Sequence, residues 1–256
     1  MEISSLTLLC IFSFLAGLVD SIVGGGGLIQ VPAMLIILPH LPITTILGTN
    51  KLVSITGTLV AASRYAGKMS LPWRIVLPTA AAAFGMSFLG AWVVSGISPD
   101  NLRPWIIVLL IVIAGVVYFR KDLGQIHAPR INGPRAGALG LLAGAAIGFY
   151  DGFFGPGAGT FLIFAFVGLF GMNFLFASAS AKVVNASTNL AALIYFGLTG
   201  HILFSVALPM AVFNVLGAIL GTRLAMWKGS RFVRVFFLVV VGGIILKLVY
   251  DTLTAA

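Results

Sequence analysis

Long apolar runs, separated by short polar or glycine-rich stretches, fill almost the whole of this chain. The runs lie at about 3–19, 28–39, 43–63, 75–97, 104–119, 136–150, 160–176, 183–200, 202–222 and 235–250. A helix needs about 20 residues to cross the hydrocarbon core of a bilayer, and several of the runs reach that length. The loops between them are too short for a separate soluble domain. The pattern therefore predicts a single polytopic α-helical transmembrane domain over residues 1–256.

The composition excludes a soluble fold. Charged residues make up 8% of the 256 residues, whereas a soluble domain carries about 25%. Apolar and aromatic residues make up 60% and the mean hydropathy is +1.13, which also excludes a disordered chain. In a membrane protein the net charge of +9 indicates basic cytoplasmic loops rather than a nucleic-acid partner. The N-terminus lacks the features of a cleaved signal peptide, so we expect residues 3–19 to be the first membrane segment.

The two halves of the chain match at a constant offset of 131 residues. The matched pairs include Asp20/Asp151, Gly24/Gly155, Gly26/Gly157, Lys51/Lys182, Pro78/Pro209 and Arg103/Arg234. Asp and Lys are scarce here, so a chance alignment of glycine-rich segments does not explain their match. The sequence predicts repeat 1 at about 3–119, a linker at 120–135 and repeat 2 at about 136–250. Each repeat is expected to hold a glycine-broken helix or hairpin followed by three membrane helices.

Loop charges predict that the two repeats have opposite orientations in the membrane. The loop at 64–74 is basic, whereas its equivalent at 197–205 has no Lys or Arg. The turn at 98–103 has one Arg and one Asp, whereas its equivalent at 223–234 has four basic residues. Because Lys and Arg accumulate on the cytoplasmic side, equivalent loops are expected on opposite faces, with both termini non-cytoplasmic. Inverted repeats with interrupted helices are typical of secondary transporters, whose substrate binds near the midplane.

A glycine cluster follows each of two intramembrane aspartates, at 24–27 and at 155–159. Glycine costs a helix interior about 1 kcal/mol and proline about 3 kcal/mol, so each cluster is expected to break a helix. Helix N-termini beyond such breaks attract anions through free N–H groups, whereas the alternative is that the glycines only allow close helix packing. The candidate backbone ligands are Gly24, Gly25, Gly26, Gly27, Gly155 and Gly157.

A polar stripe that begins with a lysine follows each glycine cluster. Positions i, i+3 and i+7 share one helical face, and each stripe has this spacing. A lysine inside a membrane helix is costly and usually faces the bundle interior, although it can also snorkel to an interface. Two such lysines from inverted repeats are expected to converge on one anion site. The candidate side-chain ligands are Asn50, Lys51, Ser54, Lys182, Asn185 and Asn189.

Asp20 and Asp151 are the acidic residues that lie well inside hydrophobic segments. They can accept hydrogen bonds from the glycine turns, pair with the lysines or carry a coupling proton, and a structural role is favoured. Weaker candidates for lining the site are Ser21, Gln30 and Thr160. The single Cys10 and three scattered His residues give no disulfide or metal-ligand pattern, and no nucleotide-binding or catalytic motif is present. We therefore expect no enzymatic activity, metal or cofactor.

These motifs resemble the TauE/SafE sulfite exporter family, also called the 4-toluene sulfonate uptake permease family. The resemblance covers nearly the whole chain and rests on residues 17–29, on Gly48-Thr49-Asn50-Lys51 and on the shortened echo of both in the second half. The segment 148–157 is similar to a bacterial subgroup whose substrates are largely unassigned. The chain departs from the commoner family pattern at Gly155-Pro156-Gly157-Ala158-Gly159 and at Ser180-Ala181-Lys182.

The resemblance implies a multi-pass protein of the bacterial inner membrane that moves sulfite, thiosulfate, sulfonates or other small organosulfur anions. With the anion site expected from the residues, the favoured hypothesis is a secondary transporter for small sulfur-containing or carboxylate anions, working by alternating access. A coupling proton is compatible with the two aspartates. The alternative is a passive channel for anions or small solutes.

Overall fold

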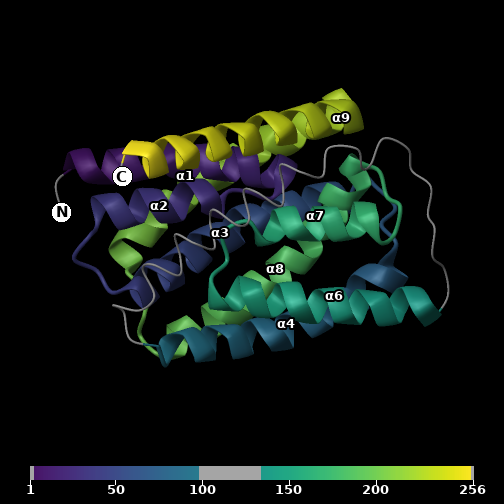
Figure 1. Cartoon of the computed structure of the whole chain (residues 1–256), viewed down its shortest axis with the longest axis horizontal. Coiled ribbons are helices and arrows are strands. Elements are labelled where there is room, and N and C mark those ends of the chain that lie inside the picture. The colour runs from purple at the N-terminus through teal and green to yellow at the C-terminus, as the bar shows by residue number, and fades with distance from the viewer. Residues whose placement is uncertain (1–2, 98–133, 255–256) are drawn as a thin grey trace.

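The computed structural model describes residues 3–97 and 134–254, and these residues form helices and no strand. The helices are α1 (Ile3–Val23), α2 (Gly27–Ile37), α3 (Ile43–Ala66), α4 (Trp73–Ser95), α6 (Pro134–Phe153), α7 (Ala158–Gly168), α8 (Phe174–Leu198) and α9 (Phe204–Thr254) (Figure 1). Gly229 has non-helical backbone angles and divides α9 into two helices. The helix expected at 104–119 and the linker up to residue 133 lie outside the described residues.

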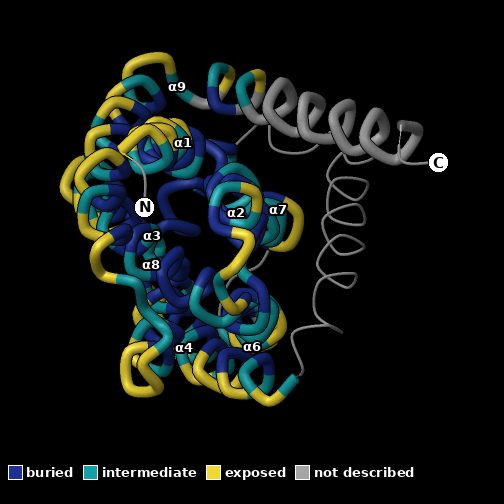
Figure 2. The backbone as a smooth tube through the Cα atoms, turned by 90° about the vertical axis from the view of Figure 1, so that its left-hand side faces the viewer, coloured by how far each residue is buried: buried dark blue, intermediate teal, exposed yellow. Residues whose placement is uncertain are grey.

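The outer surface of the bundle is apolar. Large exposed side chains include Trp92 and Leu142, which are 59% and 69% exposed. Exposed positions lie on the outside of α4, α6 and α9, and buried positions lie between the helices (Figure 2). Within the described residues four helices are long and apolar enough to cross a membrane: α1, α4, and the parts of α6 and α9 at 136–153 and 204–229. A surface of this kind marks contact with lipid, so the prediction of an all-α polytopic membrane protein is confirmed.

The helices α2 and α7 are too short to cross the membrane. Each has 11 residues, so each is about 16 Å long, roughly half the thickness of the hydrocarbon core. The Asn214 amide donates to the Ser13 carbonyl at 3.1 Å and to the Gln30 side chain at 3.4 Å, which brings α2 back alongside α1. In the second half, the rings of Tyr150 and Phe161 pack 5.4 Å apart, so α7 likewise runs back along α6. Each glycine cluster is therefore the tip of a helical hairpin.

The helices of the two halves begin 131 residues apart. The paired first residues are Ile3 and Pro134, Gly27 and Ala158, Ile43 and Phe174, and Trp73 and Phe204. This is the offset found in the sequence, although a duplication of the chain stays a prediction.

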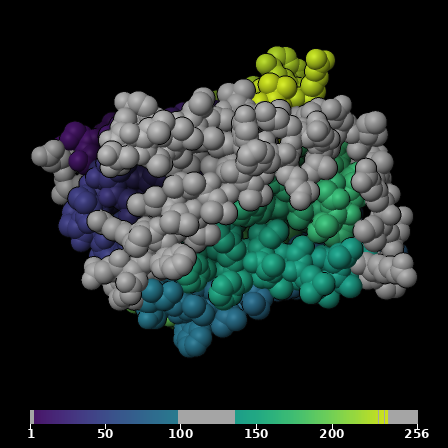
Figure 3. Space-filling model, viewed as in Figure 1, coloured from purple at the N-terminus to yellow at the C-terminus, as the bar shows by residue number. Residues whose placement is uncertain are grey.

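Each half packs its first helix against the fourth helix of the other half. A Cβ added to Gly17 of α1 would lie 2.1 Å from the Asn214 carbonyl oxygen of α9. At the positions 131 residues away, a Cβ on Gly148 of α6 would lie 2.5 Å from the Ala83 carbonyl oxygen of α4. Figure 3 shows α6 and α4 side by side along the lower edge of one face. Small residues thus bring the helices of the two halves into backbone contact.

The long helices α3 and α8 cross the centre of the bundle and run antiparallel. Gly48, near the start of α3, lies against Phe196, near the end of α8. At the opposite ends, Tyr65 donates to the Ser21 carbonyl at 3.0 Å and Ser178 donates to the Ile22 carbonyl at 2.8 Å. Both contacts fall on the last turn of α1, so the end of α3 lies beside the start of α8. Helices at equivalent places in the two halves therefore point in opposite directions.

Candidate functional site

The tips of the two hairpins meet at the centre of the bundle. Gly24, Gly155 and Gly157 have φ angles of 78°, 97° and 83°, in the left-handed region that favours glycine. A Cβ on Gly24 would lie 2.3 Å from the carbonyl carbon of Gly159, and one on Gly159 would lie 2.6 Å from the carbonyl oxygen of Gly24. The Thr160 hydroxyl also donates to the Val23 carbonyl at 3.1 Å. The glycines therefore allow direct backbone contact between the two tips.

A small cavity of about 20 Å³ lies between the tips and the two central helices. Its lining residues are Asp20, Gly24, Gly27, Asn50, Lys51, Ser54, Asp151, Gly155, Gly157, Gly159, Asn185 and Asn189. All of these except Gly159 are candidates from the sequence. A volume of this size holds one water-sized molecule, so an oxyanion requires the tips or the central helices to move apart.

Two candidate glycines and one lysine do not line this cavity. A Cβ on Gly26 would lie 2.6 Å from the carbonyl oxygen of Ala16, so Gly26 packs its hairpin together. The nearest atom to a Cβ on Gly25 would be the Thr160 hydroxyl oxygen, at 3.7 Å. Lys182 lies behind Asp20, with which it forms an ion pair. These three residues surround the cavity lining without being part of it.

Lys51 and Lys182 are buried in the bundle, with 1% and 0% of their surface exposed. The Lys51 ammonium lies 2.6 Å from the Asp151 carboxylate and also donates to the Asp151 carbonyl at 2.6 Å. The Lys182 ammonium lies 2.9 Å from the Asp20 carboxylate. Each lysine therefore pairs with the aspartate of the other half, α3 with α6 and α8 with α1. The interior orientation expected from the sequence is found, and neither lysine snorkels to an interface.

The two ion pairs differ in their surroundings. Asp151 has 2% of its side chain exposed, and it also accepts hydrogen bonds from Asn185, at 3.0 Å, and from Thr188. The Asp20 side chain is 16% exposed. Its further contact comes from the Thr58 hydroxyl at 3.4 Å, and that hydroxyl lies closer to the Ser54 carbonyl, at 2.7 Å. Asp151 is thus held by three side chains, whereas Asp20 depends mainly on Lys182.

Several polar groups at the cavity have no protein partner among the described residues. The Asn50 amide oxygen is buried and accepts no hydrogen bond. The N–H groups of Gly25, Gly26 and Gly27 donate to no described backbone carbonyl. Buried polar groups normally have a partner, so these groups provide unused hydrogen-bonding capacity beside two cations. The arrangement suits a small polar or anionic ligand.

Of the weaker candidates, neither Ser21 nor Thr160 lines the cavity. The hydroxyl of Ser21 donates within its own helix to the Leu18 carbonyl at 2.9 Å, and that of Thr160 joins the two tips. Gln30 is buried near Asn214, outside the cavity lining, and its amide nitrogen has no partner among the described residues. The sequence interpretation missed Thr188, which lies three residues after Asn185 and so shares its helical face.

Residues 9–248 match the family described as "Sulfite exporter TauE/SafE". The chain is 35% identical over 242 residues to the "Probable membrane transporter protein YfcA" of Escherichia coli (strain K12), covering 94% of this chain and 88% of that protein. It is also 35% identical over 246 residues to the "Probable membrane transporter protein ORF9" of Sinorhizobium sp, covering 96% and 93%. A "Probable membrane transporter protein" of Haemophilus influenzae is 35% identical over 249 residues, covering 97% and 96%. No solved structure matches the chain.

The match and the apolar bundle lead to the same conclusion. The family model covers nearly all of the chain, including both hairpins and both lysines of the central ion pairs. The related proteins are membrane transporters by name, and the helices form a multi-pass membrane protein. The chain therefore belongs to the TauE/SafE sulfite exporter family of membrane transporters.

Proposed function

We propose that this chain is a secondary transporter of the inner membrane that carries small anions by alternating access, and that it is not an enzyme. Its substrates would be sulfite, sulfonates, other small organosulfur anions or carboxylates, bound between the two hairpin tips. The observation that carries the proposal is the pair of exchanged ion pairs, because both buried lysines lie beside unpartnered backbone N–H groups.

The charges at the site make proton coupling the natural companion of anion transport. Two lysines and two aspartates give the two ion pairs a net charge of zero. Adding an anion would leave an uncompensated negative charge in the protein interior, which costs several kcal/mol. A proton that enters with the anion removes this cost. The anion then takes the place of a carboxylate beside a lysine.

Asp20 is the better candidate for the proton carrier. It has fewer hydrogen-bond donors than Asp151 and its side chain is more exposed, at 16% against 2%. The titratable groups near Asp20 are Lys182 of α8, Tyr65 of α3 and, across the cavity, Lys51 and Asp151. Protonation of Asp20 would release Lys182 to bind the anion. Asp151 would keep Lys51 in place.

The antiparallel arrangement of α3 and α8 supports inverted repeats and alternating access. In inverted-repeat transporters one repeat rocks against the other around a fixed site. Here the two hairpin tips meet at that site, and each ion pair joins one repeat to the other. Breaking one pair at a time would open the site to one side of the membrane and then to the other.

Transport by purified protein in liposomes tests the proposal. We expect saturable uptake of labelled sulfite or of a short alkanesulfonate, with counterflow when the inside is preloaded with unlabelled substrate. Lys51→Ala and Lys182→Ala should each lower uptake at least tenfold, whereas Lys228→Ala, which changes an exposed lysine of α9, should not. Uptake that persists in both site variants would overturn the site assignment. Uptake without saturation or counterflow would favour the channel alternative.

A further inference from the structure

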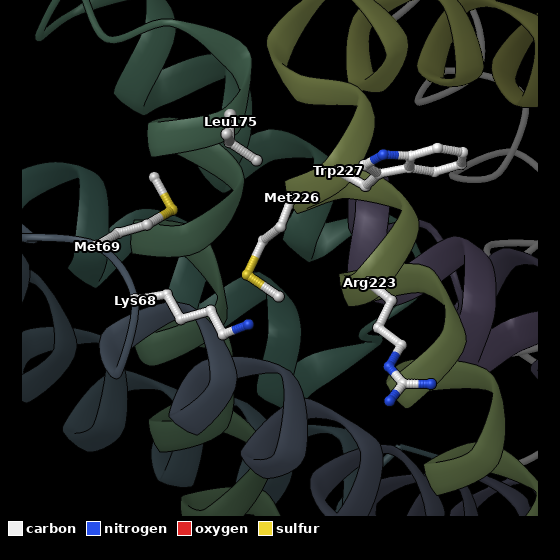
Figure 4. A pocket seen from close by; sticks show the side chains of 6 residues that line it. All are labelled: Lys68, Met69, Leu175, Arg223, Met226 and Trp227. Carbon is white, nitrogen blue, oxygen red and sulfur yellow. The ribbon is translucent and has the colours of Figure 1, made fainter.

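A larger cavity, of about 420 Å³, lies at one end of the bundle. It is formed where the connection between α3 and α4 meets α9 and the start of α8. Its lining residues are Lys68, Met69, Leu175, Arg223, Met226 and Trp227 (Figure 4). In Figure 4 the Lys68 ammonium points toward α9, and the Met226 side chain points back from α9 toward it.

The two cations of this cavity have no carboxylate partner in the described part of the chain. The ion pairs found there are the two in the centre, Lys51–Asp151 and Lys182–Asp20. Lys68 and Arg223 are both exposed. The sequence also assigns this end of the bundle to the cytoplasm, because the basic loops 64–74 and 223–234 meet here. The cavity therefore presents unpaired positive charge at the edge of the cytoplasmic leaflet.

A similar cavity without charge occupies the equivalent place in the other half. It has a volume of about 380 Å³ and is lined by Trp92, Val93, Ser95, Gly96, Ile97 and Tyr195. Three of these residues, Trp92, Ser95 and Gly96, lie 131 positions before Arg223, Met226 and Trp227. The fold thus produces a hollow at both places, but only one of the two has cations. The positive charge is not a requirement of packing.

We propose that the cavity at Lys68 and Arg223 binds the headgroup of an anionic phospholipid from the cytoplasmic leaflet. The phosphate would lie between the two cations, and the first part of the acyl chains would contact the apolar residues Met69, Leu175 and Met226. Trp227 is 80% exposed, as is usual for tryptophan at the headgroup level. A small hydrophilic anion would gain nothing from this apolar lining. Basic pockets between membrane helices on the cytoplasmic side are known to bind such headgroups.

Thermal unfolding of the purified protein in a neutral detergent tests this site. Titration with short-chain phosphatidylglycerol should raise the unfolding temperature, since a ligand that binds the folded state stabilises it. Phosphatidylcholine with the same chains should raise it much less. The double variant Lys68→Gln/Arg223→Gln should need about tenfold more phosphatidylglycerol for the same rise. Arg74→Gln is the control, because Arg74 is exposed and does not line the cavity.

Three outcomes would overturn the proposal. Equal stabilisation by phosphatidylcholine would mean that only the apolar surface is bound. An equal effect of inorganic phosphate at the same concentration would indicate a site for a soluble anion instead of a lipid. An unchanged response of the double variant would place the lipid elsewhere. Because both substituted side chains are exposed, the variants should fold, and liposome transport by them shows directly whether the central site is intact.

Discussion

The central ion pair of Lys51 and Asp151 depends on the absence of a side chain at Gly155. A Cβ at that position would lie 3.0 Å from the Lys51 ammonium and 3.3 Å from the Asp151 carboxylate. The φ angle of 97° is also one that other residues rarely adopt. The same glycine therefore serves both the hairpin turn and the close approach of a lysine to it.

Gly155→Ala should lower the free energy of unfolding by about 1–2 kcal/mol, because a non-glycine residue is strained in this backbone region. It should also lower transport, since Lys51 has to move away from Asp151. Gly85→Ala is the matched control, because a Cβ on this glycine of α4 would have no neighbour within 4 Å. Thermal unfolding in detergent and liposome uptake measure the two effects. Equal stability of the two variants would contradict the strain assigned to Gly155.

The unequal surroundings of Asp20 and Asp151 predict different effects of the same substitution. In Asp20→Asn the carboxamide cannot titrate, so accumulation driven by a pH gradient should disappear while exchange between two substrate pools continues. In Asp151→Asn three donors lose their carboxylate partner. That variant should lose stability but keep any pH-driven accumulation that its folded fraction supports. Undiminished pH-driven accumulation by Asp20→Asn would exclude Asp20 as the proton carrier.

At the level of helices, the hairpins α1–α2 and α6–α7 form the barrier between the two sides of the membrane. Their tips touch through Gly24 and Gly159 and are tied by the Thr160 hydroxyl. Glycine in this contact keeps the two backbones close enough to close the cavity. A methyl group in the contact would hold the tips apart.

Gly159→Ala should therefore lower transport strongly, with a loss of about 1–3 kcal/mol of stability from overpacking. Gly25→Ala in the opposite tip is the control, because its new methyl group would meet ordinary contact distances of 3.7 Å or more. Both variants should be compared for uptake and for leakage of a small anion from liposomes. Normal transport by Gly159→Ala would show that the tips do not need to touch.

At the scale of the whole molecule, the sequence predicted those features that follow from the cost of charge in a membrane. Two lysines and two aspartates inside apolar segments had to face the interior, and the structure has them there. The exchange of partners, Lys51 with Asp151 and Lys182 with Asp20, was not predicted. It depends on how α3 and α8 cross, and the residue spacing along one chain does not contain that information.

The glycine clusters illustrate the same limit. The sequence predicted both breaks, because four consecutive glycines or a Gly-Pro-Gly segment will not continue a helix. It did not separate Gly26, which packs against Ala16, from Gly24 and Gly27, which line the cavity. Identical residues in one run acquire different roles only when the hairpin closes. Gly159 escaped prediction because the tip that it contacts is distant in the sequence.

The inverted orientation of the halves can be tested at two equivalent positions. Lys68 and Thr199 lie 131 residues apart in the sequence, and both are exposed. Inverted repeats place them on opposite sides of the membrane, with Lys68 in the cytoplasm. In a Cys10→Ser background, Lys68→Cys should react with an impermeant thiol reagent only in inside-out vesicles, and Thr199→Cys only in whole cells or right-side-out vesicles. Reaction of both from the same side would refute the inversion, whereas the reverse assignment of sides would keep the inversion and move the basic cavity to the outer face.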